Sequence, residues 1–120
     1  MPNQEKATLF EDKKANFSRF KPWLDMPVVI LQNEKSISYS ETLITYFVQE
    51  SKNIISLGSP TAGANGDVNY IKIRDNYITF SQAFAVDNND NCYFSTGLKP
   101  TIFCEENEIE KAIEWIKTCQ

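Results

Sequence analysis

Residues 26–67 read MPVVILQNEKSISYSETLITYFVQESKNIISLGSPTAGANGD, and this stretch decides the fold. Two apolar runs, at 28–31 and 54–57, are short and rich in β-branched residues, which is typical of strands buried on both faces. Apolar residues recur between them at the spacing of one helix face: Leu43, Ile44, Phe47 and Val48. Ser40 is the predicted N-cap of this helix. Strand, helix and strand in this order predict a β-α-β unit with parallel strands.

The rest of the chain predicts a hairpin, a short strand and a last helix. Residues 67–73 and 77–86 are strand-like and flank the turn Arg74-Asp75-Asn76. The acidic and amide residues of 87–91 lack the glycine and distal glutamate of an EF-hand, which favours a solvated loop. Residues 97–103 predict a further strand. The last helix should cover the core with an apolar face. This face is formed by Ile109, Ala112, Ile113 and Ile116. Together the elements predict an α/β core with a mixed sheet.

Composition excludes several classes of protein and site. The 120 residues make one domain at most, and the net charge of −4 disfavours nucleic acid and anionic membrane as partners. No apolar run is long enough to cross a bilayer, so no membrane insertion is expected. The three cysteines form no CxxC pair and the chain has no histidine. We therefore expect no metal or cofactor, and no Ser-His-Asp site within one chain.

The segment Ser36-Ile37-Ser38-Tyr39-Ser40-Glu41 places hydroxyl groups where a helix begins. Backbone N–H groups and the positive end of the helix dipole converge at such a point. A nucleophilic serine there would lie beside groups that stabilise an oxyanion. On pattern alone, a helix cap is the simpler interpretation.

Three ordered motifs resemble peptidase family S41, which includes the C-terminal processing (tail-specific) and tricorn-like proteases. The motifs are Ser38-Tyr39-Ser40-Glu41, Pro60-Thr61-Ala62-Gly63 and Gly97-Leu98-Lys99-Pro100-Thr101-Ile102. The resemblance covers roughly residues 22–118. It implies an incomplete ClpP/crotonase-like core made of the β-α-β unit, the hairpin and the C-terminal helix. Residues 1–21 are then a polar lead-in, and residues 22–120 are the C-terminal portion of an S41-like core domain.

The resemblance also implies a serine-type endopeptidase. Ser38 aligns with the nucleophile, and attack on a peptide carbonyl would give an acyl-enzyme that water hydrolyses. The backbone N–H of Tyr39 would be one oxyanion donor. Gly63 and Ala64 would contact the substrate, which is a peptide or protein. No cofactor is implied.

Two departures from the family pattern bear on catalysis. The lysine that acts as base in the processing branch aligns with Ala64, and the aspartate of the third motif aligns with Thr101. Nothing in residues 1–26 matches the upstream half of the family core, which carries a glycine-rich oxyanion loop. We therefore expect a C-terminal piece of an S41-like protein that is inactive in isolation.

Two alternatives remain open. One is a non-catalytic S41-like module that binds peptides or has a structural role and has lost its base. The other is an unrelated α/β domain with a serine-capped helix. By resemblance, the protein would belong to the bacterial cell envelope or be secreted, although the chain shows no signal peptide. Self-association into a homo-oligomer is a further possibility, because an incomplete sheet leaves open edges and apolar surface.

Overall fold

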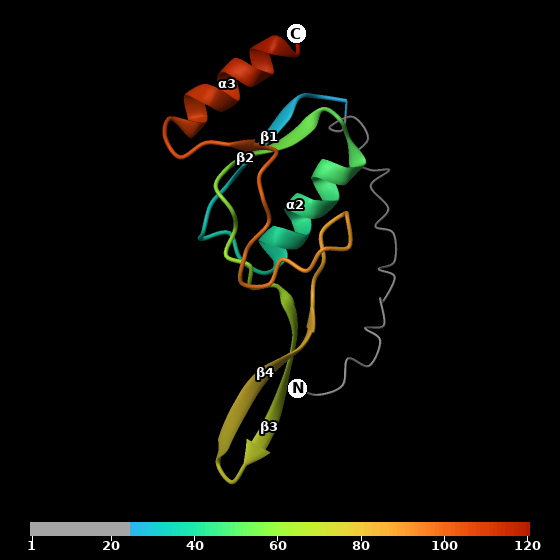
Figure 1. The fold of residues 1–120 in the computed structure, drawn as a ribbon, viewed down its shortest axis with the longest axis vertical. Helices are drawn as coiled ribbons and strands as arrows, with labels where there is room; N and C mark the ends of the chain where they lie inside the picture. The colour runs from blue at the N-terminus through green and yellow to red at the C-terminus, as the bar shows by residue number, and fades with distance from the viewer. Residues whose placement is uncertain (1–24) are drawn as a thin grey trace.

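The computed structural model describes residues 25–120, which Figure 1 shows as a ribbon. In chain order, the elements of this part are β1 (Val28–Gln32), α2 (Tyr39–Glu50), β2 (Ile54–Gly58), β3 (Gly66–Ile73), β4 (Asn76–Phe84), β5 (Ile102–Phe103) and α3 (Glu108–Thr118). The mixed α/β fold class is confirmed. The lead-in predicted at 1–21, with the three residues that follow it, lies outside the described residues. None of the helices in 25–120 has the length and apolar character needed to cross a membrane.

The predicted β-α-β unit is confirmed. Strands β1 and β2 pair in parallel, with Val28 opposite Ile54, and α2 connects them. Strand β5 pairs in parallel with the other edge of β2, so the order is β1-β2-β5 and β2 is central. All five residues of β2 are buried. The prediction that both strands are buried on both faces is wrong for β1, because β1 is an edge strand of the described sheet and is only partly buried.

The predicted hairpin is confirmed, but it does not join a mixed sheet. Strands β3 and β4 pair antiparallel and form a separate two-stranded sheet. Ile73 pairs with Asn76, so the connecting loop has two residues, and Arg74 adopts a φ of 54° in it. In Figure 1 the hairpin extends away from the helices and the three-stranded sheet.

The strand predicted at 97–103 is wrong except for its last two residues. Gly97 has a φ of 79°, which lies outside the conformation of a strand. The Leu98 backbone instead bonds to the loop after β2, since its carbonyl accepts the Thr61 N–H at 3.2 Å. Strand β5 therefore begins only at Ile102.

The helices cover the core less completely than their apolar patterns predict. Ile44 of α2 is buried and packs with Tyr93 and Leu98, whereas Leu43 is exposed. Helix α3 buries Ala112, but its Ile109 and Ile113 are exposed. The predicted faces are thus wrong at Leu43, Ile109 and Ile113, because within residues 25–120 no element covers these side chains.

Candidate functional site

The turn before α2 holds Ser38 in a strained conformation. The helix begins at Tyr39 and its N-cap is Ser38, so the prediction of Ser40 as N-cap is wrong. Ser38 has a φ of 59° and a ψ of −120°, a combination that non-glycine residues rarely adopt. Strain of this kind costs about 1–3 kcal/mol and persists only where neighbouring contacts impose it. Ser38 itself is exposed.

The contacts that impose this conformation come from Glu41, whose side chain is completely buried at 0% exposure. Its Oε1 accepts hydrogen bonds from the Thr61 hydroxyl at 2.6 Å and from the Gly63 N–H at 2.7 Å. Its Oε2 accepts the Ser38 N–H at 2.9 Å and the Ala64 N–H at 3.2 Å. A buried carboxylate is costly unless it is hydrogen-bonded, and four donors offset that cost here. Glu41 thereby ties the first turn of α2 to the loop after β2.

The third motif joins the same cluster through Thr61. The Thr61 hydroxyl donates to Glu41 and accepts the Leu98 N–H at 2.8 Å. Gly63 has a φ of 68°, and a Cβ placed there would lie 2.6 Å from the backbone nitrogen of Gly97. Only glycine therefore fits where the second and third motifs touch. All three motifs meet around the Glu41 carboxylate.

The predicted site residues lie around this carboxylate as well. Ser38, Gly63 and Ala64 are brought together because each donates its N–H to Glu41. The side chain of Tyr39 is 83% exposed. Its N–H is the first of the helix and donates to no group within residues 25–120. The carbonyl of Gly63 accepts the Ser95 N–H at 2.8 Å, so both backbone polar groups of Gly63 are engaged inside the protein.

The resemblance aligns the family base with position 64, where this chain has alanine. Lys72 lies in the hairpin, where its Nζ is 5.7 Å from the centre of the Tyr77 ring. Lys52 follows the C-terminal end of α2, whereas Ser38 precedes its N-terminal end. Within residues 25–120, no three His, Cys, Asp or Glu side chains are grouped so that they could hold a metal ion.

Thr101, which the resemblance aligns with the family aspartate, has a structural partner. Its Oγ1 accepts the Ser56 N–H at 3.1 Å, and the Ser56 hydroxyl accepts the Thr101 N–H at 3.0 Å. The two residues thus exchange hydrogen bonds between β2 and the segment that enters β5. This threonine holds the sheet together at its β5 side.

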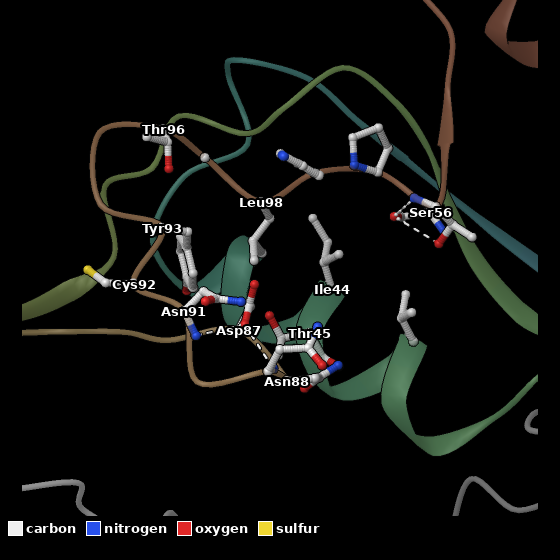
Figure 2. A pocket seen from close by; sticks show the side chains of 16 residues that line it. Ile44, Thr45, Ser56, Asp87, Asn88, Asn91, Cys92, Tyr93, Thr96 and Leu98 are labelled. Atoms are coloured by element: carbon white, nitrogen blue, oxygen red, sulfur yellow. Dashed lines mark hydrogen bonds between the residues drawn. The ribbon is translucent and has the colours of Figure 1, made fainter.

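A hollow of about 620 Å³ lies beside α2. Figure 2 shows Tyr93 at one end, Ser56 at the other, and Asp87 and Asn88 along one side. Burial raises the pKa of the Tyr93 phenol, whose oxygen accepts a hydrogen bond from the Asn65 amide at 2.8 Å. None of the predicted site residues lines this hollow, so it is separate from the Ser38 turn.

The central role of Glu41 was missed by the sequence reasoning, although one signal pointed to it. A serine followed three residues later by glutamate is a capping box, in which the glutamate side chain accepts the N-cap N–H. Ser38 and Glu41 have this spacing and this bond. The signal marks Ser38 as the N-cap, but it does not indicate that Glu41 also binds the loop after β2.

Comparison with solved structures shows similar folds. A putative peptidase from Parabacteroides merdae has a TM-score of 0.63 and 20% identity, with 75% of this chain and 31% of that chain covered. A lipoprotein from Streptococcus agalactiae has a TM-score of 0.63 and 21% identity, with 78% and 32% covered. Mature CPAF complexed with lactacystin has a TM-score of 0.57 and 19% identity, with 78% and 19% covered. The chain therefore spans about a third or less of the length of these proteins.

Sequence comparison identifies the family. No curated protein matches the chain. The family model for Peptidase family S41 matches residues 2–103, which is most of the chain and includes the Ser38 turn and both motif loops. The chain therefore belongs to peptidase family S41.

Proposed function

We propose that this chain supplies the nucleophile, Ser38, of a serine-type endopeptidase core. The observation that carries the proposal is the conformation of Ser38, which is exposed and strained where a helix begins. Strained residues cluster at active sites, and a sharp turn from strand to helix is one way in which hydrolases present a nucleophilic serine. A residue that served only to cap the start of a helix would need no strained backbone.

The hydrogen bonds around Ser38 support one assignment of the oxyanion donor. The Ser38 N–H is committed to Glu41, so it points into the protein. The Tyr39 N–H is unengaged within the described chain and lies at the positive end of the α2 dipole. Attack by the Ser38 hydroxyl on a peptide carbonyl would place the developing oxyanion near this N–H, while the hydroxyl proton passes to a general base. The C–N bond would then break, with that proton transferred to the departing amine, and water would hydrolyse the ester to release the acid and restore the Ser38 hydroxyl.

Substrate contact and the general base belong to the same proposal. Because the polar backbone groups of Gly63 are engaged internally, we place substrate contact at the exposed outer side of this loop, at Ala64. Alanine cannot accept a proton, so the base must come from outside these residues. We therefore expect no turnover of peptides by this chain alone. Tail-specific cleavage, and a place in the bacterial cell envelope or outside the cell, are the expectations for the whole protein.

Labelling with a fluorophosphonate probe tests the nucleophile. We expect slow labelling that accelerates with pH, because hydroxide must replace the missing base, and that is lost in Ser38→Ala. Ser40→Ala is the matched control, since Ser40 is also exposed, lies two residues away and should leave the labelling unchanged. Labelling that survives Ser38→Ala, or that is lost equally in both variants, would contradict the proposal.

One observation favours a second function, a non-catalytic peptide-binding or structural module. Glu41, Thr61 and Gly63 form a complete hydrogen-bonded cluster although the base position is alanine. The architecture therefore does not depend on catalytic competence. A folded sample that shows no labelling at Ser38 at any pH would favour this module over the peptidase.

A further inference from the structure

Gln32, the last residue of β1, carries the only buried side chain of that strand and is 4% exposed. Its amide nitrogen donates to the Leu98 carbonyl at 2.8 Å and to the Ser59 carbonyl at 3.1 Å. Carbonyl oxygens cannot donate, so the amide nitrogen, and not the amide oxygen, faces both of them. Gln32 lies outside the three motifs, and its side chain joins the loop after β2 to the third motif.

The contacts of Gln32 lead to Ser38 through an unbroken series of hydrogen bonds. The Leu98 carbonyl that accepts the Gln32 amide also accepts the Thr61 N–H, at 3.2 Å. The Leu98 N–H donates to the Thr61 hydroxyl, which in turn donates to Glu41. The other oxygen of Glu41 accepts the Ser38 N–H. Gln32 is therefore the first member of a series that ends at the strained turn.

The main chain around Gln32 contacts the same loops through bonds that do not involve its side chain. The Ser59 N–H donates to the Gln32 carbonyl at 3.1 Å, and the Ala62 N–H donates to the Ser36 carbonyl at 2.9 Å. The loop after β2 therefore stays attached to β1 and to the segment before α2 whatever side chain is present at position 32. A substitution there removes the two bonds of the amide nitrogen and leaves these main-chain bonds in place.

The amide of Gln32 should contribute little net stability. Its oxygen, Oε1, is buried and has no hydrogen-bond partner within residues 25–120. A buried polar atom without a partner destabilises a fold, and this effect opposes the bonds of the amide nitrogen. Gln32→Met replaces both amide atoms by a side chain of similar length. The Leu98 carbonyl then keeps the Thr61 N–H, and water can reach the partly exposed Ser59. We therefore expect only a small change in the free energy of unfolding.

We propose that Gln32 is a positioning residue for Ser38, which acts through Leu98, Thr61 and Glu41 and not by contact with a substrate. The Gln32 amide fixes the Leu98 carbonyl and thereby the place from which Thr61 presents its hydroxyl to Glu41. Loss of the amide lets the two motif loops shift against each other, and Glu41 then holds the Ser38 N–H less firmly. A role in catalysis rests on the proposed function, whereas the coupling between Gln32 and the Ser38 N–H does not.

Hydrogen exchange of the Ser38 N–H, followed by NMR in the full chain, tests the coupling without using the reactivity of the serine. We expect this N–H to exchange about 3–10-fold faster in Gln32→Met, because its bond to Glu41 opens more often. The N–H groups of the buried strand β2 should exchange at unchanged rates, which a residue that served only to stabilise the whole fold would not produce. Gln32→Leu, which also lacks both amide atoms, should give the same result.

Two further variants show whether the effect is specific and which residue transmits it. Gln49→Met makes the same change at an exposed position of α2 and should leave exchange of the Ser38 N–H unchanged. Thr61→Val interrupts the series at its third member and should itself accelerate this exchange. Adding Gln32→Met to Thr61→Val should then give little further acceleration, because substitutions within one hydrogen-bond network are not additive.

Fluorophosphonate labelling separates a failure of this inference from a failure of the proposed function. If Ser38 is the nucleophile, its labelling should slow in Gln32→Met by a factor similar to the change in exchange. A wild-type chain that is not labelled, but whose Ser38 N–H responds to Gln32→Met, would overturn the nucleophile and leave the coupling in place. Labelling that keeps its rate although exchange accelerates would overturn the role of Gln32 in positioning the hydroxyl.

Three results would overturn the coupling itself. The first is unchanged exchange of the Ser38 N–H in both Gln32→Met and Gln32→Leu. The second is equal acceleration of the β2 N–H groups, which would show that Gln32 stabilises the whole fold and not the turn. The third is full additivity of Gln32→Met and Thr61→Val, which would show that the effect does not pass through Thr61.

Discussion

The backbone N–H of Ser38 donates to the carboxylate of Glu41 at 2.9 Å, and this bond holds a strained turn in place. The same carboxylate binds Thr61 and Gly63 through its other oxygen. Hydrogen bonds to charged groups contribute about 1.5–3 kcal/mol each, enough to offset strain of about 1–3 kcal/mol at one residue. The geometry of Ser38 therefore depends on a glutamate that is wholly buried.

Replacement of Glu41 should destabilise the chain strongly. Glu41→Ala leaves four hydrogen-bond donors without their acceptor. In Glu41→Gln an amide nitrogen replaces one carboxylate oxygen, and because this nitrogen cannot accept hydrogen bonds, the two donors that face it lose their acceptor. We expect each variant to lose about 2–4 kcal/mol in the free energy of unfolding, measured by urea denaturation. Glu50→Gln changes the same chemistry at an exposed position of α2 and should have little effect. A similar small effect for both glutamates would show that the Glu41 bonds do not stabilise the fold.

Gly97→Ala should destabilise the contact between the second and third motifs. Gly97 has a φ of 79°, and a Cβ there would lie 2.0 Å from the Thr61 carbonyl oxygen. We expect a loss of about 2–4 kcal/mol in unfolding free energy. Ser95→Gly is the control in the same segment, because Ser95 already has a φ of 64° and glycine relieves that conformation. It should be close to neutral, and a large loss there would mean that backbone conformation is not the deciding factor.

The prediction from sequence succeeded where one local pattern determines the outcome. The apolar runs at 28–31 and 54–57 correctly predicted the parallel pair of strands, and the turn at Arg74–Asp75 correctly predicted the hairpin. It failed where a distant segment decides. Ser38 and Ser40 are both good caps, and the choice depends on which N–H the Glu41 carboxylate binds.

One omission and one further error have the same origin. Glutamate in the first turn of a helix is normally exposed, so the burial of Glu41 depends on a loop about twenty residues away. The apolar face of α3 is complete as a pattern, but Ile109 and Ile113 find no cover within residues 25–120. A pattern indicates which side chains can be buried, and only the rest of the fold determines which are.

The loop that follows β4 should lose stability in acid. Backbone hydrogen bonds, first of all from Asn91, lower the pKa of the Asp87 carboxyl below 3.8. Because the folded state favours the ionised form, this contribution is present above about pH 4 and is lost as the pH falls through the depressed pKa. NMR titration of the Asp87 carboxyl should show this depressed pKa. In Asp87→Asn, the loss of stability at low pH that is due to this carboxyl should disappear. An Asp87 carboxyl with a pKa at or above 3.8 would contradict the assignment.

Ala64→Lys should restore a base to the Ser38 turn. The N–H groups of Ser38 and Ala64 share the same oxygen of Glu41, so a lysine at 64 starts from a backbone position close to Ser38. The Ala64 side chain is exposed, so a longer side chain has room to extend. We expect fluorophosphonate labelling at Ser38 to become about 10–100-fold faster as the new amine loses its proton with rising pH.

The matched control is Ala64→Met, which adds a side chain of similar length without an amine. Equal labelling of the lysine and methionine variants would show that bulk, and not a base, affects the reaction. Combining Ala64→Lys with Ser38→Ala should abolish the gain, because the amine has no hydroxyl to activate. If the gain survives in this double variant, the lysine itself reacts with the probe and the nucleophile is not Ser38. If the gain requires both residues, the turn retains a geometry in which the Ser38 hydroxyl can be activated by a base placed at position 64.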